Sequence, residues 1–170
     1  MTEKSYKDTS KEEKRAEKIL RRLDSEFKIS VHGEDSAFLT LVRTILSQNT
    51  NRNNTKKAYE NLISKFETPE EMAEAEIEEI IELIKPAGLY TNKSKSIKKI
   101  AEKISEKNGI NIDRIIRKNP EKARKELLEL PGVGPKTADC VLLFSGDRDV
   151  LPVDTHVKRL AKRLGFVKQD

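Results

Sequence analysis

Apolar residues recur at intervals of three and four along nearly the whole chain, the spacing that places them on one face of an α-helix. The pattern predicts a helix from the capping box Ser10-x-x-Glu13 to about Phe27. Further helices are predicted where the same spacing returns, at 38–46, 58–66, 77–84, 97–104, 120–128 and 155–165. Alternating apolar and polar residues, which mark a half-buried strand, are essentially missing. The sequence therefore predicts an all-α protein.

Prolines and capping residues indicate where several of these helices begin or end. The run Thr-Pro-Glu-Glu at 68–71 combines an N-cap, a proline at the first helical position and a capping-box glutamate. A polar loop is expected over 50–55, and the helix over 77–84 is expected to stop before Pro86. Asn-Pro at 119–120 is expected to open a helix that leads directly into a glycine-rich turn.

That turn, at 132–134, is followed by a predicted helix with Lys136 on its first turn. Gly132 and Gly134 lack Cβ, so the backbone there can turn tightly and approach a phosphate closely. Backbone N–H groups and the positive helix end attract an anion. The same positive end disfavours the charged form of a lysine, and a neutral lysine is a nucleophile.

Asp154 follows Lys136 by eighteen residues and precedes an amphipathic helix. If the chain folds back toward Lys136, the carboxylate could accept a proton from the lysine and stabilise a cationic intermediate. Asp154 could also be the N-cap of the helix that follows it. The two roles are compatible, because a capping carboxylate is held rigidly, as a catalytic group should be.

The segments 130–138 and 151–157 resemble the helix-hairpin-helix plus Gly/Pro-Asp signature of the endonuclease III superfamily of DNA glycosylases. The resemblance implies a two-lobed helical glycosylase fold. It also implies that Lys136 attacks the sugar carbon of a damaged nucleotide while Asp154 assists. A lysine at this position implies a lyase step in addition to release of the base.

Two upstream segments extend the resemblance. Segment 45–50 resembles the loop at a helix end that fills the hole left by an extruded base, and segment 88–90 resembles a second loop that penetrates DNA. The implied DNA-contacting residues are Gln48, Asn49, Leu89, Gly132, Val133, Gly134 and Thr137. Two alternatives stay open: Gln48 and Asn49 could be ordinary polar residues at a helix end, and Leu89 could pack inward.

The resemblance implies a base-excision repair glycosylase with AP lyase activity that extrudes a damaged base and nicks the strand by β-elimination. An oxidised pyrimidine is the expected substrate. Segment 136–140 also resembles the 8-oxoguanine branch, in which the cysteine at the Cys140 position lines the base pocket. Cys140 could otherwise be a small core residue. Uracil, mismatched thymine and a non-catalytic DNA-binding hairpin remain alternatives.

In this family a six-helix bundle forms one lobe, expected here at 34–146, and the second lobe would contain 1–33 and 147–170. Relatives usually continue for several more helices and often end in four cysteines that hold an iron–sulfur cluster. This chain ends sixteen residues after Asp154 and has one cysteine. We therefore expect an incomplete second lobe, a fragment of a longer protein, and neither a cofactor nor a metal ion.

The net charge of +5 suits a polyanionic partner. Residues 67–82 contain eight glutamates and no Lys or Arg, whereas residues 91–118 contain nine Lys and Arg against three Asp and Glu. We expect the acidic stretch to face away from DNA and the basic one to flank it, although both could be solvated helix surface. The single cysteine, the lack of a long apolar stretch and the polar start predict a cytoplasmic location and no contact with a membrane. The resemblance implies a monomer that binds double-stranded DNA containing a damaged base.

Overall fold

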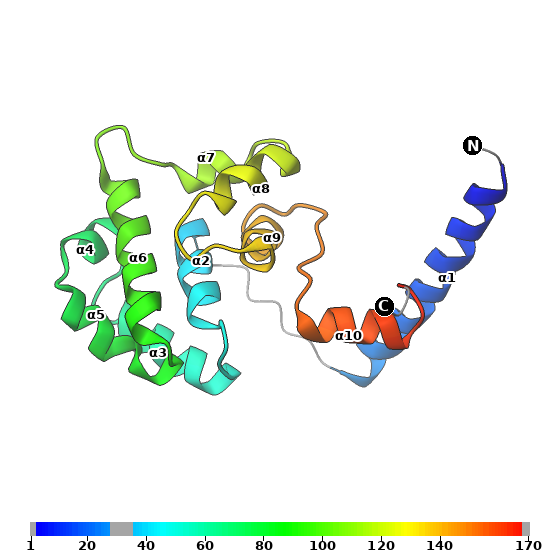
Figure 1. The fold of residues 1–170 in the computed structure, drawn as a ribbon, viewed down its shortest axis with the longest axis horizontal. Helices are drawn as coiled ribbons and strands as arrows, with labels where there is room; N and C mark the ends of the chain where they lie inside the picture. The colour runs from blue at the N-terminus through cyan, green and yellow to red at the C-terminus, as the bar shows by residue number, and fades with distance from the viewer. Residues whose placement is uncertain (1–2, 28–35, 168–170) are drawn as a thin grey trace. The chain divides into compact units, whose positions relative to one another are not determined.

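The computed structural model describes residues 3–27 and 36–167, and all regular secondary structure in these residues is helical (Figure 1). The prediction of an all-α protein is confirmed. The chain divides into two units, Gly33–Asp154 and Met1–His32 with Thr155–Asp170. The helices of the larger unit are α2 (Ala37–Leu46), α3 (Arg52–Ile63), α4 (Pro69–Glu74), α5 (Ile77–Ile84), the 3₁₀ helix η1 (Lys85–Ala87), α6 (Tyr90–Ser105), α7 (Ile112–Ile116), α8 (Pro120–Leu128) and α9 (Pro135–Phe144). Those of the smaller unit are α1 (Glu3–Glu26) and α10 (Thr155–Arg163).

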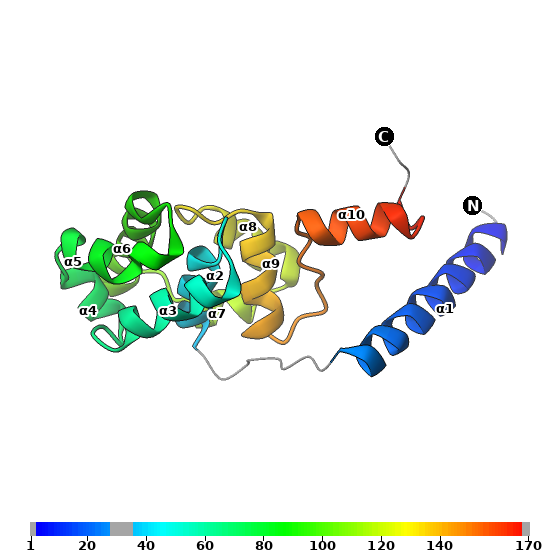
Figure 2. The same cartoon turned by 90° about the horizontal axis from the view of Figure 1, so that it is seen from below.

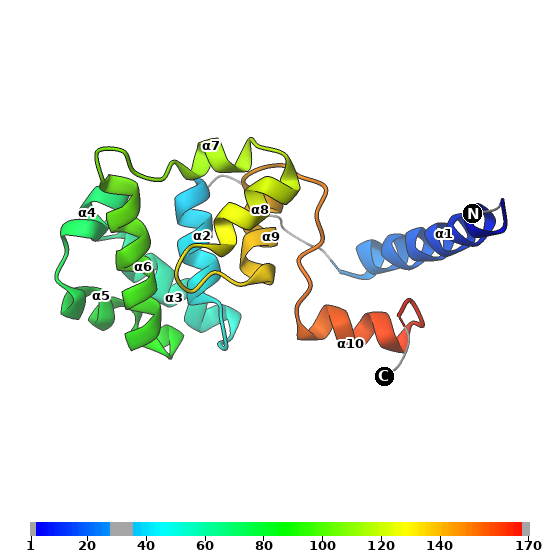
Figure 3. The same ribbon diagram turned by 45° about the horizontal axis from the view of Figure 1, so that its top comes forward.

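Helix α2 is the centre of the larger unit. It packs against α9 on one side and against α3 and α6 on the other (Figure 3). Its mostly apolar sequence buries seven of its ten residues, among them Leu41, Ile45 and Leu46. A helix that is apolar on most of its surface must be covered on several sides, which explains why α2 became the centre.

Local sequence signals set most helix starts. Thr68 Oγ1 accepts a hydrogen bond from the Glu71 amide at 3.2 Å, and the Glu71 carboxylate accepts one from the Thr68 amide at 3.2 Å. The predicted capping box is therefore confirmed. Helix α3 begins at Arg52, inside the expected polar loop, because the Asn51 side chain caps it by accepting a hydrogen bond from the amide of Asn54.

Two other helix assignments differ from the sequence-based expectation. Helix α1 begins at Glu3 and continues through Ser10, where a capping box was expected. Neither proline nor glycine occurs in 3–9, so nothing in the sequence stops the helix from extending toward the N-terminus. Helix α7 was not predicted, since five residues are too few to display a helical period.

Helices α8 and α9 form the hairpin (Figure 2). Arg124 on α8 donates to both carboxylate oxygens of Asp139 on α9, with Nε to Oδ1 at 2.8 Å and Nη2 to Oδ2 at 3.1 Å. The Asp139 carboxylate is buried and the Arg124 side chain is partly exposed, so the bidentate pair lies at the edge of the core. The pair fixes the two helices relative to each other on either side of the glycine-rich turn.

Residues after α9 remain attached to the larger unit. Arg148 Nε donates to the carbonyl of Ile116 at 3.0 Å, and Val150 packs against the core. The unit therefore extends to Asp154, whereas the sequence analysis placed 147–154 in the second lobe. The expected start of the bundle, at residue 34, lies outside the described residues.

The smaller unit has little apolar packing of its own. Arg15 on α1 donates to the carbonyl of Leu164, and its guanidinium lies 5.2 Å from the centre of the Phe166 ring. Leu20 and Leu23, which the sequence places on the apolar face of α1, are exposed, and α10 has no buried residue. No helix in the described part of the chain is both long and apolar enough to cross a membrane.

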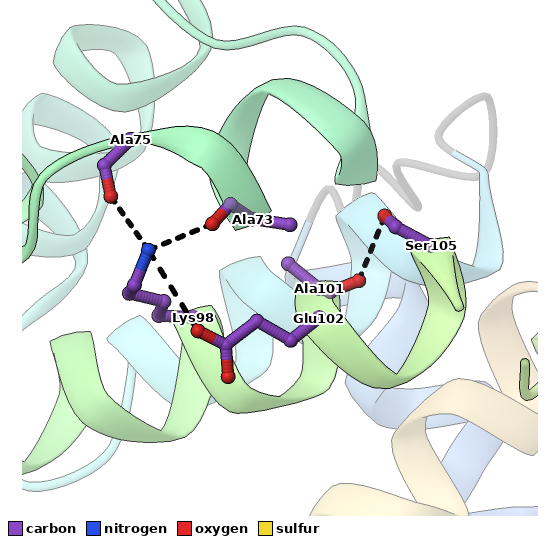
Figure 4. A network of polar contacts seen from close by, with 6 residues as sticks. All are labelled: Ala73, Ala75, Lys98, Ala101, Glu102 and Ser105. Carbon is purple, nitrogen blue, oxygen red and sulfur yellow. Dashed lines mark hydrogen bonds and ion pairs between the residues drawn. The ribbon is translucent and has the colours of Figure 1, made fainter.

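Lys98 on α6 holds the end of α4 (Figure 4). Its ammonium donates to the carbonyls of Ala73 and Ala75, both at 2.7 Å, and lies 3.7 Å from a carboxylate oxygen of Glu102. The last carbonyls of a helix have no partner within the helix, and a lysine supplied by a neighbouring helix satisfies them. The contact joins α4 and α6 at the side of the unit away from the hairpin.

We expect Lys98→Met to lower the free energy of unfolding by about 1–3 kcal/mol, because two carbonyls lose a charged donor. Urea denaturation followed by circular dichroism measures the change. Lys99→Met, at an exposed position on the same helix, is the matched control and should leave the midpoint nearly unchanged. Equal midpoints for both variants would show that Lys98 does not stabilise the end of α4.

Candidate active site

The glycine-rich turn places one glycine against a helix and the other against open space. Gly132 has a φ of +76°, and a Cβ added to it would lie 2.5 Å from Ser96 Oγ on α6. Only glycine fits this conformation and this close approach. A Cβ added to Gly134 would meet nothing within 4 Å. Gly134 is the N-cap of α9, and no side chain caps the first turn of that helix.

Lys136 lies on that first turn, and Cys140 lies one turn further along the same helix. Burial raises the pKa of the Cys140 thiol, the Lys136 charge and a hydrogen bond from Lys136 lower it, and the carboxylates of Asp139 and Asp154 raise it. The thiol therefore lies within hydrogen-bonding reach of Lys136 and within electrostatic range of Asp154. Of the residues expected from the sequence, Lys136 and Cys140 are therefore adjacent, and the charge of Asp154 acts on the same thiol.

Asn49 and Leu89 lie at the tips of two loops and share an unusual backbone conformation. Their φ angles are +52° and +47°, in the left-handed region that side-chain-bearing residues seldom adopt. Both residues are exposed, and 56% of the Leu89 surface is accessible. Leu89 therefore does not pack inward. Each non-glycine residue in this conformation costs on the order of 1 kcal/mol, which the surrounding structure must offset.

Gln48 differs from its neighbour Asn49. Its side-chain amide donates to the carbonyl of Gly132 at 3.0 Å and to Thr137 Oγ1 at 3.3 Å. The Gln48 side chain thus faces the hairpin, while Asn49 is exposed. The sequence analysis assigned both residues to DNA contact, and the structure gives them different surroundings.

Two hairpin residues expected to contact DNA are buried. Val133 is 8% exposed and Thr137 is 3% exposed, so their side chains belong to the protein interior. These two residues can contact a ligand through their main-chain groups. The turn therefore presents main-chain groups and the open side of Gly134, which suits an anion without a preference for any base.

The sequence analysis did not identify the role of Lys93. Its ammonium is buried and donates to the carbonyls of Leu46, Gln48 and Ala87 at 2.8, 2.7 and 2.8 Å. Burial lowers the pKa of Lys93. A signal for it was present, because Lys93 occupies a position on the apolar stripe of α6 that continues with Ile97 and Ile100. A charged residue on a stripe destined for the core needs polar partners there.

The residues present do not fit an iron–sulfur cluster. Such a cluster needs four thiolates, whereas Cys140 is the one cysteine of the chain and is buried beside Lys136. Among the described residues, no group of three or more His, Cys, Asp or Glu side chains is placed to hold a metal ion.

The chain is similar to several known proteins. It is 42% identical to endonuclease III of Thermotoga maritima over 137 residues, which is 81% of this chain and 61% of that protein. A solved structure of a trapped covalent intermediate between endonuclease III and DNA matches with 31% identity and a TM-score of 0.74, covering 89% of this chain and 67% of that one. The 8-oxoguanine glycosylase/lyase of Clostridium acetobutylicum, in its apo form, matches with 26% identity and a TM-score of 0.78, covering 97% and 61%.

The chain thus spans about three fifths of the length of the Thermotoga protein. Residues 42–170, most of the chain, match the model of the HhH-GPD superfamily of base excision DNA repair proteins. The helical fold and the hairpin of α8 and α9 agree with that match. The chain belongs to the HhH-GPD superfamily.

Proposed function

We propose that the protein is a base-excision repair glycosylase with AP lyase activity that acts on double-stranded DNA containing a damaged base. The observation that carries the proposal is the grouping of Lys136, Cys140 and Asp154 beside the uncapped first turn of α9. A lysine nucleophile needs a neighbouring group that can take its proton and stabilise the positive charge that develops. We propose that Asp154, whose charge acts on the Cys140 thiol beside Lys136, does both.

The hairpin would bind one phosphate of the damaged strand. The first turn of α9 lacks a side-chain cap, and the space beside Gly134 is open. Backbone amides and the positive helix end would hold the phosphate regardless of sequence. This contact would position the sugar of the damaged nucleotide near Lys136, which lies two residues further along.

Base release and strand cleavage would then follow from the chemistry of an amine. The neutral nitrogen of Lys136 bonds to C1′ as the bond between C1′ and the base breaks, and the base leaves with the bonding pair and is protonated. Opening of the sugar ring forms an imine between Lys136 and C1′. Removal of a proton from C2′ expels the 3′ phosphate with its bonding pair, and water hydrolyses the imine to regenerate the amine. Each step balances with protein groups and water alone.

The exposed loop tips support extrusion of the damaged nucleotide. Asn49 would enter the space that the extruded nucleotide leaves in the DNA duplex, and its side-chain amide would hydrogen-bond to the unpaired base on the opposite strand. Leu89 would insert between the bases of that opposite strand. Unstacking a base costs a few kcal/mol, which such contacts would offset. We propose that the protein does this as a monomer, in the cell interior with its DNA and without a bound cofactor.

An oxidised pyrimidine is the substrate that we favour, because the two loops and the active-site hairpin resemble those of endonuclease III and the identity to the Thermotoga protein is 42%. 8-Oxoguanine is the second candidate. The observation in its favour is the buried Cys140 thiol beside Lys136, together with the structural match to an 8-oxoguanine glycosylase/lyase.

A panel of end-labelled duplexes, each with one lesion, tests the proposal when compared with an undamaged duplex. We expect incision of the oxidised-pyrimidine duplex and of a duplex with an abasic site, and loss of both in Lys136→Gln because the amine is gone. Lys122→Gln, at an exposed position on α8, is the control and should cut normally. Preferred incision of 8-oxoguanine would select the second candidate. No incision of any lesion or of the abasic duplex would overturn the proposal.

Asp154→Asn keeps the shape of the side chain and removes its charge. We expect base release to slow by about 100-fold or more, because the amide cannot accept a proton from Lys136 or stabilise a cationic sugar. Single-turnover kinetics measure this rate. Asp149→Asn, at an exposed position in the preceding segment, should leave it unchanged. A rate for Asp154→Asn within twofold of wild type would remove Asp154 from the mechanism.

A further inference from the structure

The Lys93 ammonium joins the two loops that carry Asn49 and Leu89. Two of its acceptors precede Asn49: the carbonyl of Leu46, the last residue of α2, and the carbonyl of Gln48, in the turn after it. The third, the carbonyl of Ala87, belongs to η1, two residues before Leu89. One cation therefore contacts the base of both loops at distances of 2.7 and 2.8 Å.

The geometry suits an ammonium in particular. Lysine has three N–H donors and no acceptor, and here all three have carbonyl partners. Lys93 is 3% exposed, so the contact is shielded from water and from salt. Folding stability alone does not require a buried lysine here. Burying its charge carries a large desolvation cost, and an apolar side chain of similar volume often stabilises a protein equally.

The same network reaches the hairpin. Lys93 binds the backbone carbonyl of Gln48, and the side chain of Gln48 donates to the carbonyl of Gly132 and to Thr137 Oγ1. Thr137 follows Lys136 directly. Both loops and the start of α9 are thus tied together through hydrogen bonds from two side chains.

The hydrogen bonds of Lys93 and Gln48 can stabilise the strained backbone conformation of the two loops. Asn49 and Leu89 are both left-handed and exposed, and a loop on its own would relax away from such a conformation. A clamp on the residues immediately before each tip holds the conformation in the absence of a ligand. Binding then does not have to supply the cost of ordering the loops.

We propose that Lys93 is a positioning residue that presets the two loops, so that Asn49 and Leu89 enter the duplex together at the damaged nucleotide. The proposal rests on the proposed function, since it assigns these loops to DNA insertion. It makes Lys93 responsible for distinguishing damaged from intact DNA, a role separate from attack by Lys136.

The test uses a duplex with a tetrahydrofuran abasic-site analogue, which cannot be cleaved, and with 2-aminopurine opposite it. Insertion of the loops unstacks 2-aminopurine and raises its fluorescence. With Lys93→Met we expect this rise at saturating protein to be largely lost, and the affinity for the abasic duplex to weaken about tenfold, toward that for undamaged DNA. Affinity for undamaged DNA should stay within about twofold of wild type, because the hairpin is intact.

Two further variants distinguish a loss of loop positioning from a general loss of folding stability. Lys103→Met, at an exposed position near the end of α6, is the matched control and should behave as wild type. If Lys93→Met does not unfold cooperatively, Lys93→Arg replaces it. Its planar guanidinium keeps the charge but aims its donors differently, so the fluorescence rise should be intermediate.

The outcomes are distinct from those of the incision panel. A full fluorescence rise in a folded Lys93→Met, or in Lys93→Arg where that replaces it, would overturn the positioning role even if the variant melts at a lower temperature. The absence of a rise with the wild-type chain would overturn it as well. A rise that depends on Lys93 in a protein that cuts no lesion would support the positioning role and refute the proposed enzymatic function.

Discussion

The close approach of Gly132 to Ser96 is the contact on which the site depends. It brings the hairpin turn against α6 with no room for a Cβ, and a φ of +76° makes glycine the residue that fits. The carbonyl of Gly132 then becomes the acceptor for Gln48, which joins the end of α2 to the same point. The turn thus fixes where α9 begins, and with it the positions of Lys136 and Cys140 on that helix.

The site combines a rigid interior with an open face. On the inner side, Thr137, Cys140 and Lys93 are buried and hydrogen-bonded or packed. On the outer side, Gly134 faces open space, and Asn49 and Leu89 are exposed. A reaction in which an amine must reach one sugar carbon depends on such preorganisation, because misplacement by about 1 Å can cost on the order of 100-fold in rate.

Most of the helices and the glycine turn before Lys136 could be predicted from the sequence, because both depend on local signals. The pairing of Lys136 with Asp154 is an expectation from the family resemblance, since the two residues lie eighteen positions apart. Helical periodicity, capping residues and a glycine turn before a lysine are all readable within a few residues. Helix α7 and the start of α1 were missed because short or uninterrupted segments give no such signal. Where the side chains of Gln48 and Lys93 point could not be predicted, since the partners of Gln48 and two of the three partners of Lys93 lie more than 40 residues away in the sequence. The attachment of residues after α9 to the larger unit has a similar origin, because Arg148 donates to the carbonyl of Ile116 across 32 residues.

The most direct test of the central claim is to identify which lysine forms the imine. The wild-type chain is incubated with a duplex that contains a natural abasic site, the imine is reduced with borohydride, and the adduct is digested and mapped by mass spectrometry. We expect the sugar remnant on Lys136, the lysine beside Cys140. A remnant on any other lysine, for example the exposed Lys158 of α10, or no covalent adduct at all, would contradict it.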